Sequence, residues 1–141
     1  MNENEIAKIT VDACYRIHTY LGPGLLESVY EVVLWRELIG RGLQAQRQVI
    51  VPIVWEGQTF DEGFRADLIV EDLVIVELKS VEKIAPVHAK QLLTYLRLTD
   101  KRLGLLVNFG EIMIKDGIKR VVNGLKDDAS YQKGKISRKI L

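Results

Sequence analysis

Residues 64–80 constrain the fold of this chain more than any other stretch. They contain two short apolar runs, residues 68–70 and 73–76, that are rich in β-branched side chains and are separated by the acidic pair Glu71 and Asp72. Runs of this length, bounded by turn residues, predict strands rather than a helix. We therefore expect a hairpin of two buried antiparallel strands.

Three ionisable side chains lie where these apolar runs end. Asp67 enters the first strand, and Glu77 and Lys79 leave the second strand on one face, because strand side chains alternate. In an antiparallel hairpin, the residue numbers of the two partners in every pair add up to the same total, which we call the index sum. Asp67 and Glu77 share a face only if this sum is even. A two-residue turn at Glu71 and Asp72 gives an odd sum. The sequence therefore predicts a three-residue loop or a single bulge.

Length and composition are those of one folded domain. The 141 residues can bury a core, and fractions of 48% hydrophobic and 28% charged residues are typical of a soluble globular protein. No run is long enough to span a bilayer, and the first residues lack the positive and apolar regions of a signal peptide. The single Cys14 has no disulfide partner, which favours a reducing, cytoplasmic setting and a core role for this thiol.

The formal net charge of +1 is distributed unevenly. Residues 125–141 carry five basic and two acidic side chains, so this tail is +3 and the rest of the chain is −2. We expect a folded domain over residues 1–124 and a polar, basic, solvated tail over residues 125–141. A body with this charge is not a basic nucleic-acid clamp, although the tail could add a few phosphate contacts.

The remaining segments predict a mixed α+β fold with the element order α-α-β-β-β-α-β, followed by a C-terminal hairpin. Apolar residues at three- and four-residue spacing indicate helices, and β-branched runs between turn residues indicate strands. The expected helices are residues 3–20, 25–39 and 86–99, and the expected strands outside the central hairpin are residues 46–55, 59–64, 103–109, 112–114 and 118–122. Asp116 and Gly117 are the expected turn of the closing hairpin.

Several motifs occur together in this chain. Residues 24–30, Gly-Leu-Leu-Glu-Ser-Val-Tyr, resemble the name-giving motif of the GxxExxY family, within the PD-(D/E)xK, restriction-endonuclease-like superfamily. The resemblance continues through residues 65–68, 76–79, 91–96 and 104–110, although Ala66 replaces the superfamily's proline before the aspartate. It implies a restriction-endonuclease-like fold and a metal-dependent nuclease.

The charged residues of the hairpin also fit nuclease chemistry independently of this resemblance. Phosphodiester hydrolysis needs a cation, a positioned water and stabilisation of developing charge. Asp67 and Glu77 supply the hard oxygens that Mg²⁺ or Mn²⁺ prefers, the Leu78 carbonyl adds another, and waters complete the shell. Lys79 faces the site in this scheme, where we favour an electrostatic role over proton transfer. The alternative is a half-exposed strand end with alternating charges.

The resemblance also implies roles for side chains outside the hairpin. Glu27 is expected as a third carboxylate at the metal, directly or through water, although the helix macrodipole alone also explains a carboxylate in a first turn. Tyr30 is expected either to pack as a brace or to touch substrate. Gln91 is expected near the metal, with Tyr95 behind it at a distance of one helical turn.

Two functions stay open at this level. The first is a Mg²⁺- or Mn²⁺-dependent nuclease that acts on DNA, with RNA as an alternative, through a metal-activated water. The second is a binding module of the same fold, in which a companion protein or homodimerisation explains the neutral body. Zinc and nucleotide sites are not supported. His18 and His88 are isolated and are expected at the surface or satisfied in the core, and residues 22–24 lack the Lys-Ser/Thr of a phosphate-binding loop.

Overall fold

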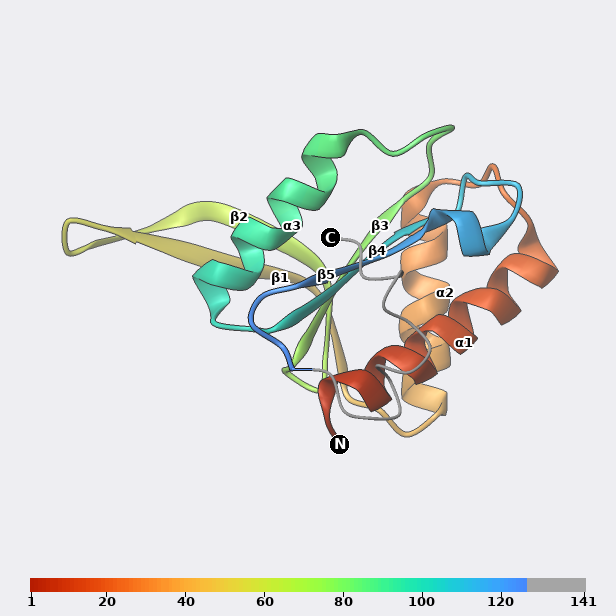
Figure 1. The fold of residues 1–141 in the computed structure, drawn as a ribbon, viewed down its shortest axis with the longest axis horizontal. Helices are drawn as coiled ribbons and strands as arrows, with labels where there is room; N and C mark the ends of the chain where they lie inside the picture. Colours follow the sequence, from red (N-terminus) through yellow and green to blue (C-terminus); the bar gives the residue numbers. More distant parts are fainter. Residues whose placement is uncertain (127–141) are drawn as a thin grey trace.

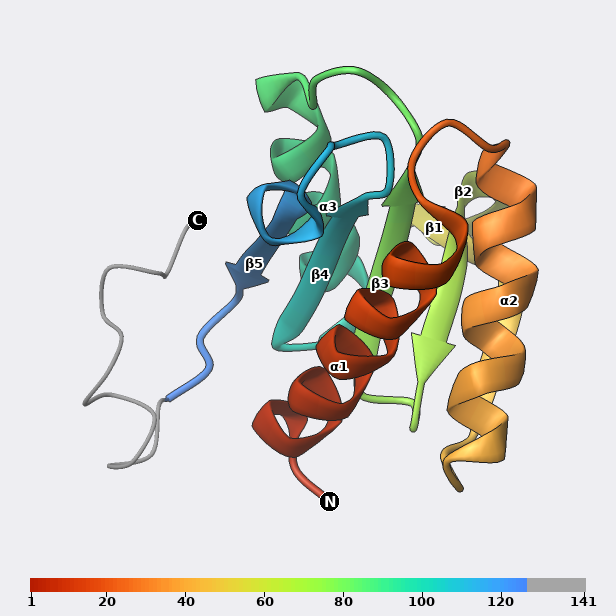
Figure 2. The same ribbon diagram turned by 90° about the vertical axis from the view of Figure 1, so that its right-hand side faces the viewer.

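The computed structural model describes residues 1–126 as a mixed sheet between helices (Figures 1 and 2). Helices α1 (Glu3–Leu21) and α2 (Glu27–Gly40) cover one face of the sheet, and α3 (Pro86–Thr99) covers the other. The strands are β1 (Ala45–Trp55), β2 (Gln58–Val70), β3 (Val74–Lys79), β4 (Leu103–Asn108) and β5 (Ile118–Val122). They lie in the order β1-β2-β3-β4-β5, with only the β3–β4 pair parallel. This arrangement confirms the predicted fold class and is consistent with a restriction-endonuclease-like fold.

Alternating side chains of the central strands build a core on each face of the sheet. Leu68 and Val76 belong to the cluster under α1 and α2, whereas Ile69 and Ile75 belong to the cluster under α3. Every residue of β4 is buried, as expected for a central strand. In residues 1–126, no helix is long and apolar enough to cross a membrane.

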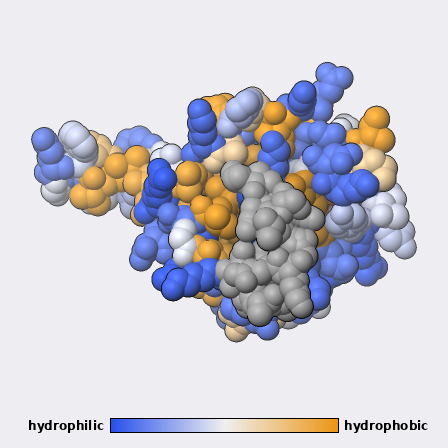
Figure 3. Space-filling model, in the orientation of Figure 1, coloured by the Kyte–Doolittle hydropathy of each residue, from blue (hydrophilic) through white to orange (hydrophobic). Residues whose placement is uncertain are grey.

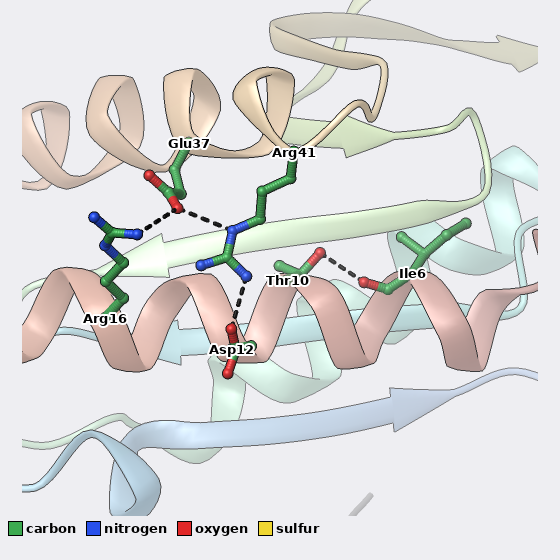
Figure 4. Close-up of polar contacts among 6 residues, drawn as sticks. All are labelled: Ile6, Thr10, Asp12, Arg16, Glu37 and Arg41. Carbon is green, nitrogen blue, oxygen red and sulfur yellow. Dashed lines mark hydrogen bonds and ion pairs between the residues drawn. The ribbon is translucent and has the colours of Figure 1, made fainter.

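Helices α1 and α2 are joined by an ion-pair network on their outer side (Figure 4). Arg41 donates from Nη1 to Asp12 Oδ2 at 2.7 Å and from Nε to Glu37 Oε2 at 2.9 Å, and Arg16 approaches the same Glu37 oxygen at 3.9 Å. Beneath this network Cys14 is fully buried, as predicted, and burial raises the pKa of its thiol to about 12. The thiol is therefore an inert core group at neutral pH.

The β2–β3 hairpin has the predicted odd loop. Val70 pairs with Val74, which leaves a three-residue loop of Glu71, Asp72 and Leu73. Glu71 and Asp72 both adopt left-handed backbone angles, with φ of 54° and 55°. The index sum of this hairpin is even, so the register places Asp67 and Glu77 on one face of the sheet.

Two predicted boundaries shift in the structure. Helix α2 begins at Glu27 rather than Leu25, because Leu26 is an extended N-cap residue and the Leu25 N–H donates to the Tyr30 hydroxyl at 3.1 Å. Strand β2 is continuous from Gln58, where a segment ending at residue 64 was expected. It turns back from β1 through the two-residue turn of Glu56 and Gly57, both with positive φ.

The predicted C-terminal hairpin between residues 112–114 and 118–122 is wrong in its pairing. Residues 112–114 form no strand, and β5 pairs instead with β4, from Leu103 opposite Val122 to Val107 opposite Ile118. Pairing with a long buried strand satisfies more backbone groups than a three-residue edge strand could. The segment between β4 and β5 ends in a 3₁₀ turn, η1 (Ile114–Gly117). From residue 127 onwards, the predicted basic tail lies outside the described residues, so its solvated state and the domain boundary stay predictions.

The η1 turn requires a glycine at its end. A Cβ atom on Gly117 would lie 2.4 Å from the Asn108 carbonyl oxygen, which is backbone and cannot move aside. Gly117→Ala should therefore lower the free energy of unfolding by about 1–3 kcal/mol, as overpacking typically does. Urea unfolding measures the loss. Gly40→Ala is the matched control, because a Cβ atom there meets nothing within 4 Å, and it should change stability little. Equal effects of the two substitutions would contradict this account.

Candidate metal centre

Asp67 and Glu77 are linked to each other across the β2–β3 hairpin. The backbone N–H of Asp67 donates to Glu77 Oε2 at 2.9 Å, and the backbone N–H of Leu78 donates to Asp67 Oδ2 at 2.9 Å. Both side chains are half-buried. Each carboxylate thus has one oxygen held by the opposite strand, which fixes its orientation and leaves its second oxygen for another partner.

The β1–β2 ladder is irregular beside Asp67. Arg47 pairs with Leu68 and Val49 pairs with Ala66, so the β1–β2 ladder skips Gln48 opposite Asp67. Gln48 has a left-handed φ of 53°, which non-glycine residues rarely adopt within a strand. On the other side of β2, the β2–β3 ladder ends at the pair of Leu68 and Val76, and the Asp67 N–H donates to the Glu77 carboxylate.

Burial and mutual repulsion disfavour the state in which Asp67 and Glu77 are both charged and have no positive partner. Burial, followed by the charge of the adjacent Asp67, raises the pKa of Glu77 to about 8. The pKa of Asp67 is also raised, first by burial and then by the charges of Glu31 and Glu27, although the Leu78 N–H opposes the shift. A proton or a cation relieves such a pair.

Lys79 contributes a positive charge to the carboxylate pair. It is half-buried two residues after Glu77, and its charge lowers the pKa of both carboxyl groups. Its ammonium makes no ion pair within 4 Å among residues 1–126, while its backbone carbonyl accepts the Phe109 N–H at 2.8 Å. The backbone is therefore anchored to the neighbouring chain segment and the side chain is left without a paired carboxylate.

Glu31 is an acidic neighbour of the site that sequence reasoning missed. It is buried on α2, where its carboxylate accepts from Arg47 Nε at 3.1 Å and from Gln48 Nε2 at 2.6 Å. Its charge raises the pKa of both Asp67 and Glu77. The only available signal was its place one turn after Glu27, since its partners come from a strand distant in sequence.

Glu27 is the exposed first residue of α2, and its charge reaches the carboxylate pair. Its charge raises the pKa of Asp67 and acts in the same direction on His88. It lines an open cleft of about 700 Å³ together with residues 23–26, residues 80–82 and Gly110. The cleft therefore joins the loop before α2 to the chain that follows β3.

Tyr30 braces that loop from within the core. It is fully buried, and its ring stacks on Phe109 with centroids 4.4 Å apart. Its hydroxyl donates to the Gly22 carbonyl at 2.5 Å and accepts from the Leu25 N–H at 3.1 Å. Of the two roles expected for Tyr30, the structure thus shows packing.

The carboxylate pair, the adjacent lysine and the mixed sheet agree with one family. The model of the PD-(D/E)XK nuclease superfamily matches residues 4–121. The chain belongs to this superfamily. No curated protein and no solved structure matches it. Members of the superfamily are typically nucleases that use divalent metal ions and act on nucleic acid, which is the chemistry suggested for this chain.

Helix α3 carries two further candidate residues, Gln91 and Tyr95. Tyr95 stacks on Phe64 with ring centroids 3.8 Å apart, and burial followed by the charges of Glu77 and Asp67 raises the pKa of its hydroxyl. Gln91 is exposed one turn earlier, and its side chain makes no hydrogen bond within the described part of the chain. Tyr95 is therefore electrostatically linked to the carboxylates, and the role of Gln91 stays a prediction.

The two histidines have structural partners. His18 Nε2 lies 2.8 Å from the Glu111 carbonyl oxygen in the core. His88 Nδ1 accepts the Ala85 N–H at 3.2 Å, which caps α3. Both agree with the expectation of satisfied histidines rather than metal ligands.

The donor set fits a hard cation held by two carboxylates. Over residues 1–126, no three His, Cys, Asp or Glu side chains gather as a metal-binding group, so Glu27 does not join Asp67 and Glu77 directly. Mg²⁺ is commonly bound by one or two carboxylates while it keeps several waters. Asp67 and Glu77, each with one oxygen held by backbone, match that requirement.

The raised pKa of Glu77 predicts a pH-dependent stability when divalent cations are removed. Between its ordinary value of 4.5 and about 8, Glu77 keeps a proton in the folded state that it releases in the unfolded state. Stability therefore falls as pH rises through this window, by about 1–3 kcal/mol after allowance for solvent screening. Urea unfolding in EDTA at pH 5 and pH 8 measures the difference. Glu77→Gln should abolish it, and the exposed Glu62→Gln should not; a persistent slope in Glu77→Gln would assign the effect to another group.

Proposed function

We propose that this chain is a Mg²⁺- or Mn²⁺-dependent nuclease that hydrolyses phosphodiester bonds, with DNA as its first candidate substrate and RNA as the second. The observation that carries the proposal is the half-buried pair of Asp67 and Glu77, oriented by reciprocal backbone hydrogen bonds beside the unpaired ammonium of Lys79. Membership of a nuclease superfamily supports it.

Each residue of the pair has a definite task in this proposal. Asp67 and Glu77 hold the cation, and the Leu78 carbonyl is a further candidate oxygen. When bound, the cation supplies charge screening at the phosphate and lowers the pKa of a water molecule. Lys79 cannot be a ligand, because its ammonium is a cation, so it neutralises the negative charge that develops on the scissile phosphate. Its side chain shares the sheet face of Glu77 by alternation.

The residues around the pair position the substrate and the loops. Glu27 acts through a water molecule from the cleft rim, and Gln91 contacts substrate from α3. We also propose that the chain belongs to the GxxExxY family. Tyr30 gives a physical reason for the tyrosine of that motif, because its hydroxyl joins the two ends of the loop before Glu27. Tyr95 holds β2 against α3 through its stack on Phe64.

Nucleic acid is supported as the partner by the charge of α3. This helix lies on the face of Asp67 and Glu77, contains Lys90 and Arg97, and has no acidic residue in its sequence. The competing function is a binding module without cleavage. It is favoured by the charge of −2 on residues 1–124, which is low for a protein that grips a phosphate backbone alone. A cytoplasmic location remains part of the proposal.

Divalent cations should stabilise the protein by mass action. Millimolar Mg²⁺ or Mn²⁺ should raise the melting temperature by about 2–8 °C, because cation binding to the folded state relieves the repulsion between Asp67 and Glu77. Differential scanning fluorimetry measures the shift, and EDTA should reverse it. Glu77→Gln should remain folded and lose the response, whereas Glu62→Gln should retain it. An unchanged response in Glu77→Gln would move the cation to another site.

Lys79→Ala separates cleavage from binding. Loss of one phosphate contact should weaken nucleic-acid affinity modestly and reduce the salt slope by about one unit. Loss of a preorganised charge should lower the single-turnover rate with Mn²⁺ by about 10²–10³. Lys101→Ala is the matched control, because Lys101 instead pairs with Asp72 in the β2–β3 loop. Equal losses of binding and cleavage would make Lys79 a phosphate anchor, and no cleavage by the parent chain would favour the binding module.

A further inference from the structure

The β1–β2 hairpin extends beyond the body of the molecule as an arm, residues 50–65 (Figure 1). At about 3.3 Å per residue, the part of β1 from Ile50 to Trp55 reaches roughly 17 Å. The arm exposes large apolar side chains: Trp55 is 67% exposed, Val54 66% and Ile50 52%. Figure 3 shows apolar residues along it behind a hydrophilic tip. Exposed apolar residues grouped in this way indicate a contact surface.

The charge of the arm argues against nucleic acid as its partner. Residues 50–65 contain Glu56, Asp61 and Glu62 but only Arg65 as a basic residue, so their net charge is −2. Such an arm would repel a phosphate backbone. Pro52 is exposed in β1, the edge strand, where it removes a backbone donor and discourages strand-to-strand extension of the sheet. The arm therefore fits a partner that offers an apolar groove with basic residues.

This chain has such a groove at the opposite end of its sheet. It has a volume of about 770 Å³ and lies between α1 and the η1–β5 segment, which flank β4 in Figure 2. Its apolar lining includes Ala7, Val11 and Ile118. Lys8, Lys115 and Arg120 surround these residues, with Asp116 as the acidic member, which gives the lining a net charge of +2. A volume of this size can accept an indole ring and its neighbours.

The sheet order prevents a chain from filling its own groove. The arm continues β1 and β2 at one edge of the sheet, and the groove lies beside β4 and β5 at the other. The C-terminal residues of the same chain are a poorer occupant on charge. Residues 127–141 carry four basic and two acidic side chains, the same sign as the groove, whereas the arm carries the opposite sign.

We propose that the arm of one copy binds in the groove between α1 and β5 of a second copy, and that the exchange is reciprocal. Trp55 and Val54 then lie against the apolar lining, and Glu56, Asp61 and Glu62 face Lys8 and Lys115. Reciprocal exchange closes a two-fold dimer in which both arms are buried. The inference is independent of nuclease activity.

Sedimentation equilibrium of the full chain tests the contact. The expected species has twice the 16.0 kDa mass of one chain and dissociates as salt is raised, because the contact pairs opposite charges. Trp55→Ser should raise the dimer dissociation constant at least about 30-fold, as loss of a central tryptophan typically does. The matched control Leu98→Ser removes a similarly exposed apolar side chain from α3 and should leave it unchanged.

A charge reversal tests the register of the contact without removing apolar surface. Lys8→Glu with Lys115→Glu should weaken the dimer, and adding Glu56→Lys with Glu62→Lys in the same chain should restore it. Restoration would support the arm-in-groove contact, because a folding defect is not repaired by a second set of substitutions at a distant site. Failure to restore, or a dimer insensitive to Trp55→Ser, would overturn it. A monomeric parent chain would also overturn it, and would leave the groove to residues 127–141 or to another protein.

Discussion

The candidate site depends on the register of one hairpin. The three-residue loop of Glu71, Asp72 and Leu73 gives the β2–β3 pair an even index sum, and only an even sum places Asp67 and Glu77 on one face. A loop one residue shorter would send one carboxylate to the other side of the sheet. The two cores stabilise this register from both faces, since Leu68 and Ile69 pack against different helices. Apolar packing therefore holds together two charges that repel each other.

Local signals in the sequence were sufficient where an element is defined by its own residues. The bounds of α3 follow from Pro86 at its start, and the loop parity follows from the positions of Asp67 and Glu77. Long-range pairing was not available from such signals. Residues 112–114 have strand-like side chains, yet the open edge of β4 takes β5 instead. Glu31 was missed for the same reason, because Arg47 and Gln48 bury it from a distant strand.

Contacts with Tyr30 and Ser80 fix the conformation of the loop before α2, which contains the start of the GxxExxY-like motif. Gly24 has a φ of 102°, a conformation that side chains rarely adopt, and the Tyr30 hydroxyl links the residues on either side of it. Ser80 Oγ donates to the Leu25 carbonyl at 2.6 Å, which ties the same loop to the end of β3. Glu27 is therefore positioned by both its helix and the strand that carries Glu77.

One irregularity relates the metal centre to the projecting arm. At Gln48 the β1 backbone turns to a left-handed φ, and the ladder skips the pair with Asp67. The Gln48 side chain donates to the buried Glu31, and beyond Gln48 the two strands continue into the arm. Val49 and Ala66, which pair with each other, separate Gln48 and Asp67 from the first residues of the arm. The strand that carries Asp67 thus also forms one side of the arm.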